Sequence, residues 1–234
     1  MNHSGIHRLA ITTGSSFRAR FLWAGCMMLS ALAGCAYQTR PTAVVFRGAA
    51  PCRGAVIMSL RRFQTHFNRS IFATLRVHGR RINLVGRWST IPPSHFKFVA
   101  LTEMGTLAVE LQRFNSRIII NHLAAQFPGT LARELGNDLY LALAAPARAA
   151  RSSPVISLGR HHVQLPVSAP GLWNGTLYFS GAAGHLALTQ LNAQRRRITI
   201  RYSRYRKGFQ PGRLTILDSG QGFKLTLDFT GNVP

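Results

Sequence analysis

Acidic side chains are rare in this 234-residue chain: it has 6 Asp and Glu against 29 Lys and Arg, for a formal net charge of +23 at pH 7. All but three of the basic residues are arginine. So few carboxylates leave little material for general acid and base pairs, although Glu110, Asp218 and Asp228 are candidates to meet in space. The positive charge instead predicts an anionic partner surface.

The composition alone does not identify which kind of anion this surface would bind. Nucleic acid is one candidate, because Arg and Lys neutralise phosphates and release counterions. Phospholipid head groups and lipopolysaccharide phosphates are another, since a basic residue near an anionic membrane gains about 1 kcal/mol. A third possibility is a codon bias towards arginine, with the charges spread over solvated strand faces. The densest cluster runs from Arg195 to Lys207 and includes Tyr202 and Tyr205.

Cysteine is also scarce, and Cys26, Cys35 and Cys52 are too few for a disulfide framework. The sequence has no Gly-x-Ser-x-Gly elbow, Walker loop, His-Glu-x-x-His helix or Cys-x-x-Cys pair. The adjacent His161 and His162 would point to opposite faces of a strand, which does not suit a metal site. We therefore expect no enzymatic activity, no cofactor and no metal.

The apolar segment near the N-terminus is too short to cross a bilayer. Residues 21–34 are apolar or small apart from Ser30, which is the length of a signal h-region, and three arginines and no acid precede them. The segment ends at Leu32-Ala33-Gly34-Cys35, the pattern with which bacterial lipoproteins begin. We therefore predict that residues 1–34 are a lipoprotein signal peptide and that the Cys35 thiol is acylated.

Acylation would hold the protein firmly at a membrane. Residue 36 is alanine and not the aspartate of an inner-membrane retention signal, which favours the outer membrane and a periplasm-facing protein. Export argues against a nucleic-acid partner. Residues 35–54 lack sustained periodicity and are predicted to be the acylated N-terminus and a tether, with Cys52 as an incidental thiol. An uncleaved apolar anchor and acylation at Cys26 are the alternatives.

Beyond residue 70 the apolar pattern has a period of two, which is typical of strands with one buried face. In the last such segment Leu225 lies on the apolar side and Lys224 on the polar side. The predicted strands are residues 71–77, 82–88, 96–102, 106–112, 117–121, 155–158, 162–167, 172–180, 185–191, 198–203, 213–217 and 223–229.

One segment between these strands has a helical repeat. Its apolar stripe is Leu131, Leu135, Leu139 and Leu143. Thr130 is the predicted N-cap and Pro146 the predicted end. A short helix over residues 55–66 is also expected. The pattern predicts a mainly β fold with one or two helices: a single curved antiparallel sheet, an open half-barrel, with a helical cover.

Two segments carry a family resemblance. Residues 96–111, FKFVALTEMGTLAVEL, are similar to the hairpin of LolB-like outer-membrane lipoproteins. Residues 212–229 are similar to the C-terminal strand pair of that family, with Pro211 before the pair and Asp218-Ser219-Gly220 as its turn. The helix, with FPGT before it and Ala-Pro near its end, resembles uncharacterised LolB-like relatives. The resemblance covers residues 65–230.

The resemblance implies a domain over residues 55–234 that holds acyl chains in an apolar cavity and delivers lipoproteins or lipids to the outer membrane. Its partners would be acyl chains or a lipidated client, outer-membrane lipid and a soluble periplasmic donor. Met104 stands where the family has an exposed apolar residue that inserts into the membrane, although the Asn-Pro before it is missing. An ordinary turn methionine is the alternative.

The implied cavity would lie between the leucine stripe and the apolar face of the sheet. Its candidate lining residues are Leu131, Leu135, Leu139, Phe96 and Phe98. Other large aromatics that would line or fill this space are Phe72, Trp88, Trp173, Phe179, Phe223 and Phe229. If these aromatic side chains fill the space, the alternative hypothesis is an accessory envelope lipoprotein with a closed core. Such a protein would dock on an envelope complex or anionic glycolipid through its basic surface.

Overall fold

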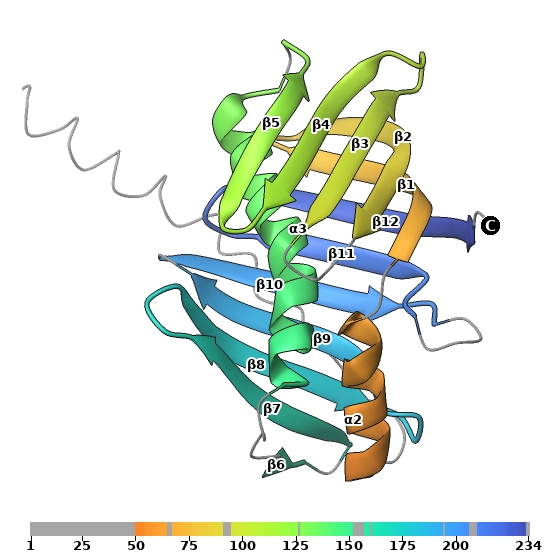
Figure 1. Cartoon of the computed structure of the whole chain (residues 1–234), viewed down its shortest axis with the longest axis vertical. Coiled ribbons are helices and arrows are strands. Elements are labelled where there is room, and N and C mark those ends of the chain that lie inside the picture. The colour runs from red at the N-terminus through yellow and green to blue at the C-terminus, as the bar shows by residue number, and fades with distance from the viewer. Residues whose placement is uncertain are drawn as a thin grey trace, which may run out of the picture. The chain divides into compact units, whose positions relative to one another are not determined.

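The dominant feature of the computed structural model is one antiparallel sheet (Figure 1), and the structure describes residues 50–64, 67–90, 95–125, 127–151, 157–159, 161–193, 195–205 and 210–232. The helical elements are α2 Arg53–Arg61, the 3-10 helix η2 Arg62–Gln64 and α3 Gly129–Ala149. The strands are β1 Phe67–Val77, β2 Arg80–Thr90, β3 Phe96–Thr102, β4 Leu107–Phe114, β5 Arg117–Leu123, β6 Ser157–Leu158, β7 His162–Ala169, β8 Trp173–Ser180, β9 His185–Ala193, β10 Arg196–Ser203, β11 Arg213–Asp218 and β12 Phe223–Asn232.

The strand order is β5-β4-β3-β2-β1-β12-β11-β10-β9-β8-β7-β6. Most neighbours are consecutive hairpins, and the long-range pair is β1 with β12, in register from Ile71 opposite Phe229 to Val77 opposite Phe223. The order does not return to its start, so β5 and β6 are the edges of an open sheet within the described residues. The predicted open antiparallel sheet is confirmed.

Alternation along the strands sets which side chains face the core. On β1, Ile71, Ala73 and Leu75 are at most 2% exposed, whereas Phe72 and Arg76 point to the opposite face. Phe72 is 54% exposed, so its expected place among the interior aromatics is wrong. Successive side chains of a strand point to opposite faces of the sheet. Because Ile71 and Ala73 point inward, Phe72 between them must point outward.

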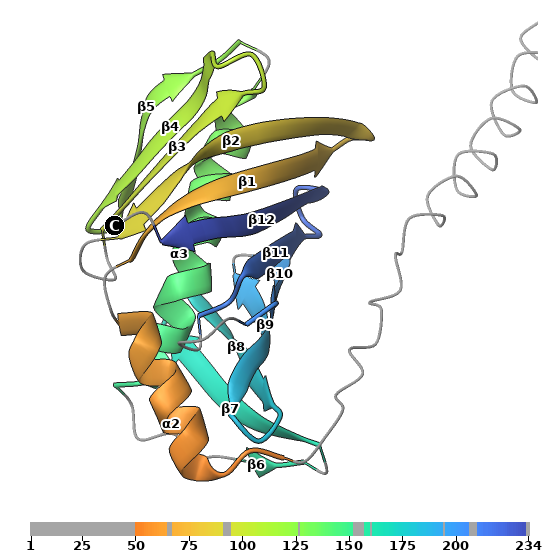
Figure 2. The ribbon, with the colours of Figure 1, turned by 90° about the vertical axis from the view of Figure 1, so that its right-hand side faces the viewer.

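Both helices lie on one side of the sheet, which curves round α3 (Figure 2). Helix α3 contacts β4 and β5 near one edge and β7 near the other, and α2 packs against β9 and α3. Their apolar residues join the inward-facing strand residues in one hydrophobic cluster. None of the helices in the described residues is long and apolar enough to span a membrane.

Both helix predictions were right in place and wrong at their ends. Helix α3 begins at Gly129 with Pro128 as its N-cap, so Thr130 lies inside the first turn. A proline before the first turn starts the helix without a side-chain cap because its fixed φ and missing N–H are tolerated there. Pro146 lies inside α3, which continues to Ala149. Helix α2 runs from Arg53 to Arg61, earlier than the predicted 55–66.

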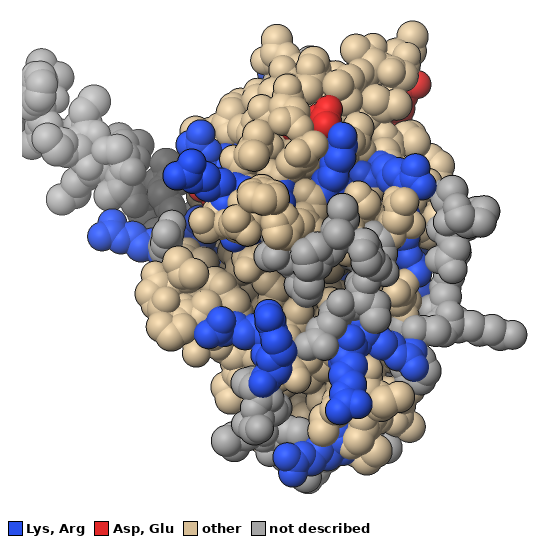
Figure 3. Space-filling model, viewed as in Figure 1, with Lys and Arg blue, Asp and Glu red and all other residues tan. Residues whose placement is uncertain are grey.

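Basic side chains are spread over the face drawn in Figure 3, where few acidic ones appear. The arginine-rich cluster of the sequence is divided by the fold. Arg197 is exposed, but Arg196 bonds to acids of α3 and Tyr202 is 4% exposed in the core. The last members of the cluster, residues 206 and 207, lie outside the described residues. The cluster is therefore not a single basic patch in the described part of the chain.

Candidate functional site

The five candidate lining residues come together in the structure. Leu131, Leu135 and Leu139 of α3 are at most 5% exposed, and Phe96 and Phe98 of β3 are at most 4% exposed. All five belong to the same hydrophobic cluster. The helix stripe and the inward face of the sheet thus form one apolar interior, as the sequence predicted. Contact of this kind has no directional requirement, so it suits hydrocarbon of any shape.

A glycine lets α3 approach the edge strand β5 closely. A Cβ added to Gly136 would lie 2.9 Å from Cγ2 and 3.2 Å from Cδ1 of Ile118. Both distances are shorter than ordinary carbon contacts, so a larger residue at position 136 would push the helix off the strand. The contact places the first half of α3 directly over β5.

The proline inside α3 is accommodated by a tyrosine of the sheet. Pro146 has no N–H to donate to the carbonyl of Ala142, four residues earlier. The hydroxyl of Tyr202 donates to that carbonyl at 2.9 Å. Burial raises the pKa of Tyr202, which keeps this hydroxyl a donor. The helix therefore passes through Pro146 because β10 supplies the missing hydrogen bond.

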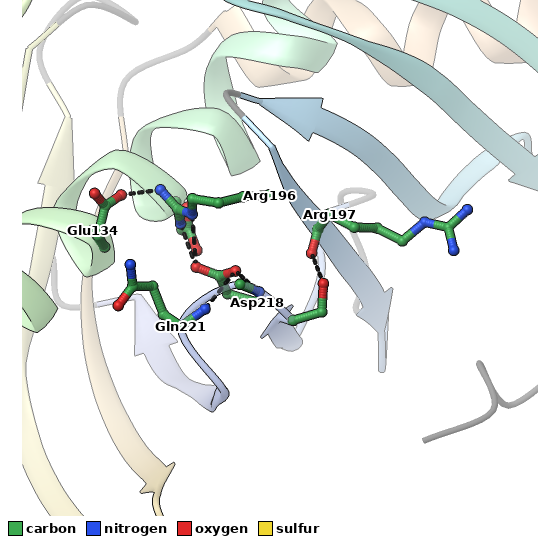
Figure 4. Close-up of polar contacts among 8 residues, drawn as sticks. Glu134, Arg196, Arg197, Asp218 and Gln221 are labelled. Atoms are coloured by element: carbon green, nitrogen blue, oxygen red, sulfur yellow. Dashed lines mark hydrogen bonds and ion pairs between the residues drawn. The ribbon is translucent and has the colours of Figure 1, made fainter. Parts of the chain in front are cut away.

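A buried ion cluster fixes the first half of α3 to the turns at the end of the sheet (Figure 4). Arg196, at the start of β10, forms ion pairs with Glu134 of α3 and with Asp218 at the end of β11, and it also donates a hydrogen bond to Asp138 of α3. Its Nη2 lies 2.7 Å from Oδ1 of Asp138, and its Nε lies 3.0 Å from Oδ2 of Asp218. The backbone N–H of Gly220 donates to Oδ1 of Asp218 at 2.8 Å. One guanidinium thus joins the helix to two strand ends.

Asp138 is the least solvated member of this cluster. Its side chain is 0% exposed, and its Oδ2 is buried without a hydrogen-bond partner. Burial and the nearby Asp218 carboxylate raise the pKa of Asp138 to about 9. With three carboxylates around one guanidinium, a neutral Asp138 is the less costly state at neutral pH.

This raised pKa predicts that the fold becomes less stable as the pH rises above the usual pKa of an aspartic acid. The unfolded chain releases the Asp138 proton near pH 3.8 and the folded chain near pH 9, so the stabilisation is complete below the lower value and is lost as pH rises through the higher one. Relative to Asp138→Asn, the wild type should lose up to about 1.4 kcal/mol of unfolding free energy per pH unit between about pH 5 and about pH 8. Urea unfolding at several pH values measures the difference.

Glu110→Gln is the matched control for this measurement. Hydrogen bonds from Lys97 and Asn121 lower the pKa of Glu110, so its contribution changes only in acid. The difference between wild type and Glu110→Gln should therefore stay constant over the same pH range. A constant difference for Asp138→Asn as well would show that Asp138 is ionised in the folded protein.

Two further polar contacts hold α3 along its length. The guanidinium carbon of Arg113, on β4, lies 3.4 Å from the ring centroid of Tyr140. Burial lowers the pKa of Arg113. Near the other end of the helix, Nε of Arg148 donates to the carbonyl of Ser168 on β7 at 2.6 Å. The helix is thus attached by polar groups to both halves of the sheet and by apolar groups to its interior.

Met104 lies at the tip of the β3–β4 hairpin and is 90% exposed. The loop is closed by hydrogen bonds from Thr102 N–H to the Thr106 carbonyl at 2.8 Å and from Gly105 N–H to the Thr102 carbonyl at 3.0 Å. Gly105 has a φ of +79°, a conformation that favours glycine. The hairpin therefore presents an unbranched apolar side chain to solvent on an ordered turn.

The remaining sequence predictions divide as follows. Cys35, the signal peptide and most of the tether lie outside the described residues. Cys52 precedes α2 and is an exposed free thiol. The candidate acids Glu110, Asp218 and Asp228 do not meet, because the strand register places them apart: Glu110 pairs with Lys97, Asp218 with Arg196 and Asp228 with Arg213.

Comparison with models of known families gives no match, and comparison with curated proteins gives none either. Solved structures do match. A crystal structure of a LolA superfamily protein from Nitrosomonas europaea is similar with a TM-score of 0.50 and 12% identity, over 78% of this chain and 93% of that one. The fold is LolA-like. The resemblance to LolB-like proteins is therefore confirmed at the level of fold.

Two more solved structures are similar over comparable shares of the chain. A domain described as an outer membrane lipoprotein-sorting protein, from Vibrio parahaemolyticus, has a TM-score of 0.45 and 7% identity, over 76% of this chain and 91% of that one. A DUF1329 family protein from Desulfovibrio piger has a TM-score of 0.34 and 8% identity, over 78% of this chain and 92% of that one.

Proposed function

We propose that this protein is a lipid-anchored envelope carrier without catalytic activity. It holds acyl chains between α3 and the sheet, takes a lipidated client or a lipid from a soluble periplasmic donor, and releases it to the outer membrane. The observation that carries the proposal is the apolar interior of a LolA-like fold, in which the α3 stripe, Phe96 and Phe98 belong to one hydrophobic cluster. The predicted acylation of Cys35 supports it, because it would keep the domain near the bilayer.

The chemistry of the interior fits hydrocarbon. Leucine and phenylalanine side chains of α3 and of the sheet belong to one hydrophobic cluster, and a buried CH₂ group gains about 0.8 kcal/mol. The ionic and polar contacts of α3 lie at Glu134, Asp138 and Tyr140 and at Arg148. Since these contacts hold the helix in place, an acyl chain enters when α3 separates from the sheet. The carrier therefore needs α3 to move as a cover.

The direct test uses the chain from residue 36 onwards, which contains every residue of the hydrophobic cluster. We expect lipids to co-purify with it, identified by mass spectrometry, and a fluorescent fatty acid to bind to it with displacement by unlabelled fatty acid. A protein that is folded, free of lipid and unable to take up the fatty acid would contradict the carrier function.

Met104 gives a prediction for the release step. Burying this side chain in a membrane gains about 1.5–3 kcal/mol, so Met104→Glu should slow the transfer of a fluorescent fatty acid to vesicles by about tenfold or more. Fatty-acid binding should not change, because the loop lies outside the apolar interior. Met104→Leu is the matched control and should transfer at the wild-type rate. Equal rates in Met104→Glu and wild type would make Met104 an ordinary turn residue.

One observation favours the second candidate function, an accessory envelope lipoprotein with a closed core. All five candidate lining residues are at most 5% exposed, which is the burial of a filled interior. In that case the domain serves as a docking module and takes up no acyl chain. The fatty-acid measurement above separates the two functions.

A further inference from the structure

The outward face of β12, β1 and β2 carries a row of three cations. Arg76 on β1 lies opposite Arg81 on β2 and opposite Lys224 on β12, and all three side chains are exposed. Like charges directly opposite each other on neighbouring strands are destabilising. A row of this kind therefore works against folding and calls for an opposing charge.

The chain does not supply that opposing charge in the residues that the structure describes, which include all six acids. Five of them lie within ion-pair distance of other cations: Glu110 of Lys97, Asp228 of Arg204 and Arg213, and Glu134, Asp138 and Asp218 of Arg196. The sixth, Glu103, accepts a hydrogen bond from Asn83 at 2.8 Å, and Asn83 in turn accepts one from Arg81. The compensating anion must therefore come largely from outside the protein.

An apolar row runs across the same outward face. Phe72 on β1 lies opposite Val85 on β2, Val85 opposite Leu101 on β3, and Leu101 opposite Leu107 on β4. Phe72 is 54% exposed and Val85 is 42% exposed. Leu101 and Leu107 flank the hairpin that carries Met104. Leu101 and Leu107 are half-buried, so Phe72 and Val85 form the exposed part of the row. Adjacent exposed apolar residues are typical of an interaction surface.

The two rows lie close enough to meet one flat partner. Phe72 and Arg76 are four residues apart on one strand, which is about 13 Å. The β1–β2 turn and the β11–β12 turn lie next to each other, at the strand ends that point away from α2 (Figure 2). Arg80, beside the β1–β2 turn, is exposed and adds a fourth cation. Apolar side chains beside cations that form no ion pair among the described residues suit a surface that is anionic outside and apolar beneath.

We infer that this outward face, defined by the cation row Arg76, Arg81 and Lys224 and the apolar row from Phe72 to Leu107, is the surface that the protein sets against an anionic phospholipid bilayer. The inference rests on the proposed function in that it names the face turned to the receiving membrane. It adds the residues that bind the head groups and an orientation in which Met104 lies at the edge of the contact.

The test compares two triple variants of the full chain that remove equal charge. The first is Arg76→Gln, Arg81→Gln and Lys224→Gln. The second, the matched control, is Arg61→Gln, Arg117→Gln and Arg133→Gln, three exposed cations from α2, β5 and α3. Both keep the same N-terminal segment, so a difference between them arises from the position of the lost charges.

Binding is measured by co-sedimentation with vesicles of equal parts phosphatidylcholine and phosphatidylglycerol, and with phosphatidylcholine alone. At low salt the first variant should lose about 100-fold in partitioning onto anionic vesicles and the control about threefold or less. On neutral vesicles the wild type and both variants should be alike. Equal losses in the two triple variants, or no loss in the first, would overturn the inference.

Arg76→Glu keeps the test decisive if the triple variant folds poorly. A carboxylate at position 76 would lie between Arg81 and Lys224 and replace two repulsions by attractions, so this variant should unfold no more easily than wild type. It should still lose anionic-vesicle binding. Fatty-acid uptake by Arg76→Glu and by the first triple variant should equal that of the wild type. If the wild type itself takes up no fatty acid, the carrier function is refuted. The vesicle experiment then tests the membrane-facing surface independently.

Discussion

Arg196→Met should destabilise the fold more than any other single loss of charge. The substitution leaves the carboxylates of Glu134 and Asp218 without their shared guanidinium, and the Asp218 side chain is 0% exposed. It also removes the hydrogen bond from Arg196 to the buried Asp138. Removing one partner of a buried ion pair costs about 3–5 kcal/mol, because the charge that remains is neither paired nor hydrated. A decrease of that size in the unfolding free energy should lower the midpoint of thermal unfolding by about 10 °C in a domain of this length. Circular dichroism during heating and urea titration measures it.

Arg197→Met is the control one residue away. It removes the same charge from the same strand, but the Arg197 side chain points away from the cluster (Figure 4) and is exposed. Its unfolding free energy should stay within about 0.5 kcal/mol of the wild type. Adding Glu134→Gln, Asp138→Asn and Asp218→Asn to Arg196→Met should recover part of the loss. If the two single variants were equally stable, the cluster would contribute nothing to holding α3.

The sheet could be predicted from the sequence because its rule is local. Alternation in Ile71, Ala73 and Leu75 requires no knowledge of the partner strand, and the four-residue leucine repeat of α3 is equally local. The end of α3 was not predictable in this way. Pro146 stops a helix unless another group bonds to the Ala142 carbonyl, and that group is Tyr202, sixty residues away in the chain.

The ion cluster was missed for the same reason. Arg196 lies 62 residues from Glu134, 58 from Asp138 and 22 from Asp218, so no spacing rule joins them. One signal was present. Glu134 and Asp138 are four residues apart beside the leucine stripe, and acids that close to a buried helix face need a cation from elsewhere in the fold. Among so many arginines, the sequence could not say which one.

These contacts give α3 two kinds of attachment with different consequences. The leucine stripe holds α3 to the interior by apolar contacts, which have no preferred direction, and a hydrocarbon chain can replace them. The Arg196 cluster and the Tyr202 hydrogen bond fix its position and cannot be replaced by hydrocarbon. An acyl chain that enters between α3 and β5 must separate Gly136 from Ile118. Because Gly136 lies between Glu134 and Asp138, that movement also works against the contacts with Arg196.

A disulfide between positions 118 and 136 should abolish acyl uptake. A Cβ at Gly136 lies 2.9 Å from Cγ2 of Ile118, and bonded carbons are about 1.5 Å apart, so the two Cβ atoms fall within the span of about 3.5–4.5 Å that a disulfide bridges. The double variant Ile118→Cys and Gly136→Cys, in the chain from residue 36 onwards with Cys52→Ser, should bind a fluorescent fatty acid when reduced. Oxidation should lower binding at least about tenfold, because α3 can no longer leave β5.

The single variant Ile118→Cys with Cys52→Ser is the matched control, since it undergoes the same oxidation without a cross-link. Its fatty-acid binding should not depend on redox state, and reduction of the double variant should restore uptake. Cross-linking should also raise the unfolding free energy, which shows that the bond forms in the native fold. If the oxidised double variant still bound fatty acid as the reduced one does, acyl chains would enter by a route that leaves the contact between α3 and β5 intact.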